Sequence, residues 1–133
     1  MAYSGTPLPK KLGIKAGARV ALIAAPADGW QLLEPLPADV TRLARLSRDV
    51  DVILAFARRK PDLERRFDAW RDAIARDGSL WIAWPKRASG VETDLTENVV
   101  RDVGVAHGLV DTKVAAITEV WSGLRFVWRL ADR

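Results

Sequence analysis

Two apolar runs decide the fold: VDVILAFA at residues 50–57 and SLWIAW at residues 79–84. Each has the length of a typical strand and is apolar at successive positions, which is the pattern of a strand buried on both faces. The segment between them begins near Pro61, a residue that is favoured in the first turn of a helix. Its apolar side chains recur at helical spacing, at Leu63, Phe67, Trp70 and Ile74. A strand, a helix and a strand in this order predict an α/β fold with parallel strands.

The preceding half of the chain continues this pattern less clearly. Residues 19–25, RVALIAA, form another apolar run that ends at Pro26 and predicts a further buried strand. One or two helical turns are expected over residues 30–36, and a short strand over residues 40–46. Gly78, which follows the central helix, is expected to end that helix in a left-handed conformation.

The C-terminal part is predicted to hold a helix and a hairpin. In the stretch DLTE, Asp94 is the expected N-cap of a helix, because a glutamate follows three residues later. Residues 113–120 and 124–130 alternate between apolar and polar side chains, as strands with one buried face do. The turn between these strands is expected at residues 122–123, Ser-Gly.

Composition limits the class of protein. At 133 residues the chain has the length of one ordinary domain, so residues 1–133 are expected to form a single α/β domain. Residues 1–15, rich in proline, glycine and lysine, are expected to form an irregular basic N-terminal arm. The cytoplasm is the expected location, because there is no cysteine, no secretion signal and no apolar stretch approaching about 18 residues. The net charge of +4 permits an anionic partner without requiring one.

The layout resembles the class I methyltransferase-like Rossmann fold, most clearly from Val50 onward. VDVILAF, the helix ending in Ala-Arg-Asp-Gly, and SLWIAWPK are similar to the fourth strand, the next helix and the fifth strand of that superfamily. The closing hairpin is similar to its antiparallel sixth and seventh strands. The resemblance implies a three-layer Rossmann-like, methyltransferase-type fold: a mostly parallel sheet, a C-terminal antiparallel hairpin and a shortened first half.

A narrower resemblance spans nearly the whole chain. The segments YSGTPLPKKLGIKAGARV, WPKRASGVETDLTE and VWSGLRFVWR look like a small bacterial family of proteins to which no activity is assigned. This second resemblance implies a family and a fold, and it implies no reaction.

The methyltransferase resemblance implies S-adenosylmethionine as cofactor, but the cofactor loop departs from the family pattern. In that superfamily the first strand ends in an acidic residue and a glycine-rich loop. Here residues 24–30 read AAPADGW, with Pro26 where an amide close to the cofactor would be expected. The acid that would hold the ribose hydroxyls has no clear counterpart, and Asp49 is the carboxylate that stands nearest. Asp28, Gly29 and Asp49 are therefore the expected cofactor-binding residues of an altered pocket.

Ligands of open α/β sheets bind beyond the carboxyl ends of the strands. Cations follow two of the predicted strand ends, as Arg58-Arg59 and as Lys86-Arg87. Cations just before a helix are mildly unfavourable, because the positive end of the helix dipole lies there, so an anionic ligand is expected. The alternative is that these charges are solvated or pair with acids such as Glu92 and Asp94, and that the tryptophans nearby belong to the core. The residues expected to contact a ligand are Trp84, Lys86, Arg87, Ser89, Arg58, Arg59 and Trp30.

The sequence leaves three functions open. The first is a non-catalytic protein that binds an anionic small molecule or a protein partner at the carboxyl edge of the strands. The second is a divergent S-adenosylmethionine-dependent methyltransferase. The third is nonspecific nucleic-acid binding through Lys10, Lys11 and Lys15 together with the cations at the strand-end edge. No catalytic group of residues is predicted and no metal site is expected, because His107 is the only histidine and the common nucleotide-binding, zinc-protease and hydrolase motifs are missing. The identity of the ligand and the oligomeric state are left open.

Overall fold

The computed structural model describes residues 5–133. Its helices are α1 (Leu8–Leu12), α2 (Gly29–Leu32), α3 (Lys60–Ala73) and α4 (Glu97–Ala106), with short 3₁₀ turns η1 (Arg87–Ser89) and η2 (Leu130–Asp132). Its strands are β1 (Arg19–Ile23), β2 (Thr41–Leu43), β3 (Val50–Phe56), β4 (Ile74–Pro85), β5 (Leu109–Ala116) and β6 (Trp121–Trp128).

The strands form one mixed sheet in the order β2-β1-β3-β4-β6-β5. β1 pairs in parallel with β2 and β3, and β3 pairs in parallel with β4. β6 runs antiparallel to both β4 and β5, so the closing hairpin is inserted beside β4. The predicted α/β fold, with a mostly parallel sheet and a C-terminal antiparallel hairpin, is confirmed.

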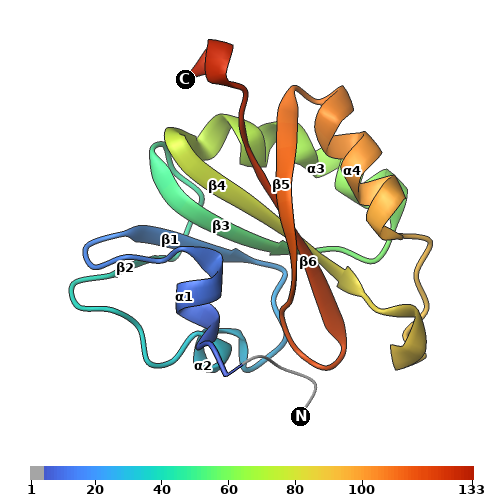
Figure 1. Cartoon of the computed structure of the whole chain (residues 1–133), viewed down its shortest axis with the longest axis horizontal. Coiled ribbons are helices and arrows are strands. Elements are labelled where there is room, and N and C mark those ends of the chain that lie inside the picture. Colours follow the sequence, from blue (N-terminus) through green and yellow to red (C-terminus); the bar gives the residue numbers. More distant parts are fainter. Residues whose placement is uncertain (1–4) are drawn as a thin grey trace.

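The helices lie on both faces of this sheet, which makes three layers (Figure 1). α3 and α4 cover one face, where the α3 side chains Leu63, Phe67 and Trp70 are buried in one core cluster. α1 and α2 are much shorter and lie over the other face, where Leu12 and Leu33 are buried in a second cluster. Among residues 5–133, no helix is long and apolar enough to cross a bilayer.

The N-terminal arm is more ordered than predicted. Pro7 precedes α1, Gly13 ends it with a φ of 79°, and Leu12 and Ile14 are buried. The indole of Trp81 donates a hydrogen bond of 3.1 Å to the Leu12 carbonyl. The expectation of an irregular arm is therefore wrong for α1, because its apolar side chains fill a face of the sheet that α2 alone is too short to cover. Residues 1–4 of the predicted arm lie outside the described residues.

The connection between α3 and β4 also differs from the prediction. α3 ends at Ala73, and Ile74 is already extended, with φ −74° and ψ 141°. Gly78 lies within β4 instead of capping the helix, and a Cβ atom there would lie 2.9 Å from the carbonyl oxygens of Val50 and Asp51. The glycine therefore allows β4 to approach β3 closely, at the point where the pairing of the two strands shifts register.

The hairpin turn lies before residues 122–123, not at them. The Ile117 amide donates to the Trp121 carbonyl at 2.9 Å, so the turn precedes β6. Gly123 is a strand residue opposite Ala83, and a Cβ atom on it would lie 2.7 Å from the Ile117 side chain. Its small size is required by packing on the sheet surface, which a local turn pattern does not distinguish from a turn requirement.

Candidate functional site

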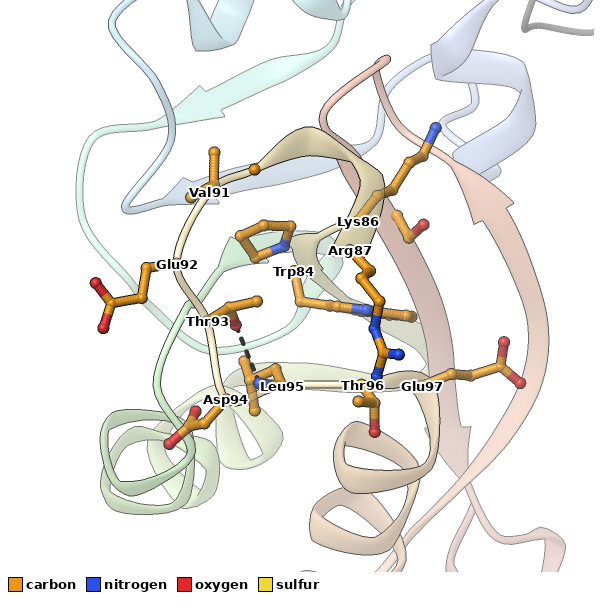
Figure 2. A pocket seen from close by; sticks show the side chains of 13 residues that line it. Trp84, Lys86, Arg87, Val91, Glu92, Thr93, Asp94, Leu95, Thr96 and Glu97 are labelled. Atoms are coloured by element: carbon orange, nitrogen blue, oxygen red, sulfur yellow. Dashed lines mark hydrogen bonds between the residues drawn. The ribbon is translucent and has the colours of Figure 1, made fainter.

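A groove of about 760 Å³ opens at the carboxyl end of β4, between that strand and the start of α4. It lies at the sheet edge where open α/β folds bind ligands. Figure 2 shows the chain from Lys86 to Glu97 curving around it, with Trp84 beneath. Its lining residues are Trp84–Arg87, Gly90–Glu97 and Ser122.

Short-range hydrogen bonds hold the first half of this loop. The Ser89 hydroxyl donates to the Lys86 carbonyl at 2.6 Å and accepts from the Val91 amide at 3.2 Å. Gly90 adopts a φ of 77°, which permits the sharp turn that follows η1. Ser89, expected to contact a ligand, therefore has its hydroxyl engaged in shaping the loop.

The second half of the loop is tied to the connection between β3 and α3. The Thr93 hydroxyl donates to the Arg58 carbonyl at 2.7 Å and accepts from the Leu95 amide at 3.0 Å. The Asp94 amide donates to the same carbonyl at 3.3 Å. The ends of two neighbouring parallel strands are thereby joined, and this fixes the outer wall of the groove.

The capping role predicted for Asp94 belongs to another residue. Thr96 is the N-cap of α4, and its hydroxyl accepts from the Val99 amide at 3.2 Å. Asp94 instead accepts a hydrogen bond of 2.7 Å from the amide of Lys60, the first residue of α3. Asp94 thus caps a helix that begins far earlier in the sequence, which the local DLTE pattern could not reveal.

The cations predicted for this edge have different partners. Arg59 pairs with Glu92 at 2.9 Å, and Lys60 lies 3.7 Å from Glu64. The Lys86 ammonium donates to the Thr118 carbonyl at 3.0 Å and so links the loop to the β5–β6 turn. The alternative expectation, that these charges pair with acids, therefore holds for Arg59.

Arg87 is the cation that points into the groove. Figure 2 shows its guanidinium reaching past Trp84 toward Thr96. No carboxylate of residues 5–133 lies within ion-pair distance of it, and the same is true of the exposed Arg58. Arg87 is therefore the charge of this edge that is best placed to meet a ligand in the groove.

Trp84 and Ser122 both line the groove. Trp84 is only 5% exposed and belongs to the core, so it can offer the groove an edge but no open stacking face. Ser122, which sequence reasoning placed at a turn, lines the groove because it pairs with Trp84 across β4 and β6. The signal that could have found it was the antiparallel pairing of the hairpin with β4, which brings the start of β6 to the end of β4.

The predicted cofactor residues lie in two different places. Asp28 and Gly29 line a separate pocket of about 440 Å³ beyond β1, together with Trp30, whose ring lies 5.2 Å from the Arg42 guanidinium carbon. Asp49 directly precedes β3, and the start of a parallel strand lies at the opposite edge of the sheet from the end of β1. The structure therefore does not bring Asp49 together with Asp28 and Gly29, nor Trp30 with the groove.

The loop after β1 does not fit S-adenosylmethionine in the way the family binds it. Pro26 has no amide hydrogen to donate, and α2 is a single turn of 4 residues. A Cβ atom on Gly29 would lie 2.6 Å from the Ala25 Cβ, so the glycine is required by internal packing. The residues that follow β2, Ala44 and Arg45, include no carboxylate for a ribose.

His107 has a partner that the sequence did not predict. Its Nδ1 atom lies 2.6 Å from an Asp68 oxygen, and Arg71 lies 2.8 Å from the same oxygen. The hydrogen bond with His107, together with the charge of Arg71, lowers the pKa of Asp68 below its usual value. This group connects α3 to the end of α4, away from the groove, and within residues 5–133 no set of three or more potential ligands is arranged for a metal ion.

Comparison with solved structures finds methyltransferases. A protein assigned to the type 11 methyltransferases from Sulfolobus solfataricus superposes with a TM-score of 0.65 at 15% identity, covering 95% of this chain and 92% of its own. Magnesium protoporphyrin IX methyltransferase from Synechocystis PCC 6803, solved with bound S-adenosylmethionine, gives 0.64 at 9% identity, covering 92% and 74%. An S-adenosylmethionine-dependent methyltransferase from Aquifex aeolicus gives 0.63 at 12% identity, covering 88% and 85%.

The chain has a methyltransferase-like Rossmann fold. The superpositions establish the architecture. At identities this low they do not establish an activity, since one fold hosts many functions. No family model matches the chain, and no curated protein sequence matches it either. The narrower resemblance to a small bacterial family therefore stays a prediction.

Proposed function

We propose that the groove between β4 and α4 binds a small molecule that carries an anionic group. The observation that carries this proposal is Arg87, whose guanidinium enters the groove without a carboxylate partner in the described chain. Thr96 and Glu97 line the same groove, so the start of α4, where the helix dipole is positive, opens onto it. A guanidinium beside a helix start is a suitable environment for a phosphate or a carboxylate.

The rest of the groove supports a ligand with an apolar part. Pro85, Val91 and Leu95 contribute apolar lining, and the edge of Trp84 lies below them. The hydrogen bonds of Ser89, Thr93 and Asp94 hold the surrounding loop before any ligand arrives. A pre-ordered loop lowers the entropy cost of binding, which favours a built site over an accidental depression.

The second candidate is a divergent S-adenosylmethionine-dependent methyltransferase. The fold neighbours favour it over a purely non-catalytic protein, because they are methyltransferases that align with most of this chain. Against it stand Pro26, the internally packed Gly29 and the separation of Asp49 from Asp28. The likeness is one of fold alone, so it supports this candidate without establishing a reaction.

Thermal melts of the full chain at low salt test the first candidate, with phosphate, nucleotides and S-adenosylhomocysteine as ligands. A ligand at about a hundred times its dissociation constant adds about 2.7 kcal/mol to the unfolding free energy, which raises Tm by several degrees. We expect nucleotides, which carry an apolar part as well as a phosphate, to raise Tm, and Arg87→Gln to abolish that shift. Arg45→Gln, a change at an exposed arginine outside the groove, is the matched control and should keep the shift.

The same melts separate the two candidates. A shift with S-adenosylhomocysteine that survives Arg87→Gln but is lost in Asp28→Ala would support the methyltransferase and contradict the groove. Asp28 is exposed and its side chain makes no capping bond, so its replacement leaves the fold intact. Melts unchanged by every compound would contradict both candidates.

A further inference from the structure

The α1 face of the sheet carries two cations side by side. Arg125 on β6 is the register partner of Trp81 on β4 and of Lys113 on β5. Directly opposed residues of neighbouring strands present their side chains on the same face. Trp81 belongs to the core on the α1 side, and the Lys113 ammonium lies 5.8 Å from the centroid of its ring. Like charges directly opposite each other destabilise a sheet, so this arrangement is unfavourable in the chain alone.

Arg125 forms no ion pair within the described chain. No carboxylate of residues 5–133 pairs with it, and its guanidinium donates to the Thr112 hydroxyl at 3.2 Å. Burial lowers the pKa of Arg125, and the nearby charge of Arg133 lowers it further. A partly buried cation without a counter-charge is costly, which points to an anion that the chain does not itself supply.

A cavity lies where such an anion would bind. It has a volume of about 360 Å³, and Arg125 and Lys15 contribute its cations. It opens where β1, β3 and β4 begin, at the opposite edge of the sheet from the groove.

Two acids also line this cavity, and neither pairs with Arg125. The Asp51 carboxylate accepts a hydrogen bond of 2.8 Å from the Arg19 amide through one of its oxygens. Asp77 is exposed and lies in the first part of β4. The guanidinium of Arg125 therefore stays available to a ligand.

We propose that this cavity binds a small oxyanion, a phosphate or carboxylate group, between Arg125 and Lys15, with Lys113 adding to the positive field beside it. The planar guanidinium suits two parallel hydrogen bonds to such a group. This site is independent of the groove, because the two share no lining residue. The anion would remove the repulsion between Arg125 and its cationic neighbours.

Isothermal titration of the full chain with inorganic phosphate at low ionic strength tests the site. We expect Arg125→Gln to weaken phosphate binding about ten- to a hundredfold, the loss that follows from removing charge-assisted hydrogen bonds. Lys113→Gln should weaken phosphate binding less, because Lys113 does not line the cavity and acts only through its positive charge. Since Lys113 is exposed, this second variant tests the site even if Arg125→Gln does not fold. Without phosphate, Arg125→Gln should melt above the parent chain, because a repulsive charge is gone.

Two control variants decide where the anion sits. Arg129→Gln removes an exposed cation outside the cavity and should leave phosphate binding unchanged. Arg87→Gln removes the cation of the groove and leaves the lining of the cavity intact, so phosphate that still binds in this variant occupies the cavity. If Arg87→Gln abolishes phosphate binding, the anion occupies the groove and the cavity proposal is wrong, whereas the groove proposal stands.

The remaining outcomes are equally direct. Phosphate binding that is the same in Arg125→Gln and the parent chain would overturn the cavity site. The cavity site would also be overturned if the parent chain and Arg125→Gln bound a DNA duplex equally and neither bound phosphate. That result would indicate a general basic surface.

Discussion

The Asp94 carboxylate accepts a hydrogen bond of 2.7 Å from the amide of Lys60, so the loop before α4 caps the start of α3. This single contact joins the connections that follow β3 and β4, and it holds one wall of the groove. A carboxylate at a helix start also interacts favourably with the positive end of the helix dipole. The loop therefore helps to hold the fold together, whether or not a ligand is bound.

Replacing Asp94 with alanine should lower the unfolding free energy by about 1 kcal/mol, the usual cost of losing a helix cap. Urea unfolding measures this as a lower midpoint at an unchanged slope. Glu92→Gln is the control, because the Arg59–Glu92 pair is exposed and such pairs contribute little. Equal losses of unfolding free energy in the two variants would show that the cap on α3 stabilises the protein no more than an exposed ion pair does.

Replacing Gly104 with alanine should destabilise the protein by about 2 kcal/mol, although alanine is the better helix former. A Cβ atom at this position of α4 would overlap the Phe126 ring, which packs against Phe67 with 5.7 Å between ring centroids. Urea unfolding is again the measurement. Val105→Ala, next to it on the exposed side of α4, should change the unfolding free energy little. A Gly104→Ala chain as stable as the parent would contradict this packing.

Acidification should weaken the link between α3 and α4. The pKa of Asp68 is lower in the folded chain than its ordinary value of 3.8, so its contribution to stability is present above that value. It is lost as the pH falls through the folded-state pKa. Urea midpoints measured between pH 3 and pH 7 should therefore fall less in Asp68→Asn than in the parent chain. Identical pH dependence in both chains would show that Asp68 contributes nothing to it.

Lys86 and Arg87 should behave differently despite being neighbours of like charge. Lys86→Met keeps the aliphatic stem but loses the bond to the Thr118 carbonyl, which should cost about 1.5 kcal/mol of unfolding free energy. Arg87→Gln should leave the unfolding free energy unchanged, because its side chain is exposed and has no protein partner among residues 5–133. Urea unfolding of both variants decides this. A loss of stability in Arg87→Gln would assign Arg87 a structural role.

Much of the architecture could be predicted because burial on both faces leaves a local trace. The runs at residues 50–57 and 79–84 became β3 and the second half of β4, and residues 19–25 contain β1. The helix between β3 and β4 was predicted from its apolar spacing, and its buried face is Leu63, Phe67 and Trp70. The loop after β4, predicted to contact a ligand, lines the groove, and Arg87 points into it. That a ligand binds there stays a prediction.

Other features could not be predicted, because the signal in the sequence has more than one structural meaning. Gly78 and Gly123 suggested a helix cap and a turn, but each lies where a neighbouring segment approaches closely. Asp94 has the pattern of an N-cap for the helix next to it, yet it caps α3. In every case the partner lies far away along the chain.

The sequence by itself determined the order of strands and helices and which stretches are buried, because periodicity and apolar runs act over a few residues. Only the tertiary structure decided which cations are free. Arg59 pairs with a carboxylate, and Lys86 donates to a backbone carbonyl. Arg87 and Arg125 form no ion pair among residues 5–133. The physical reason is that a charge is neutralised by what lies within a few ångströms of it, and the fold alone sets those distances.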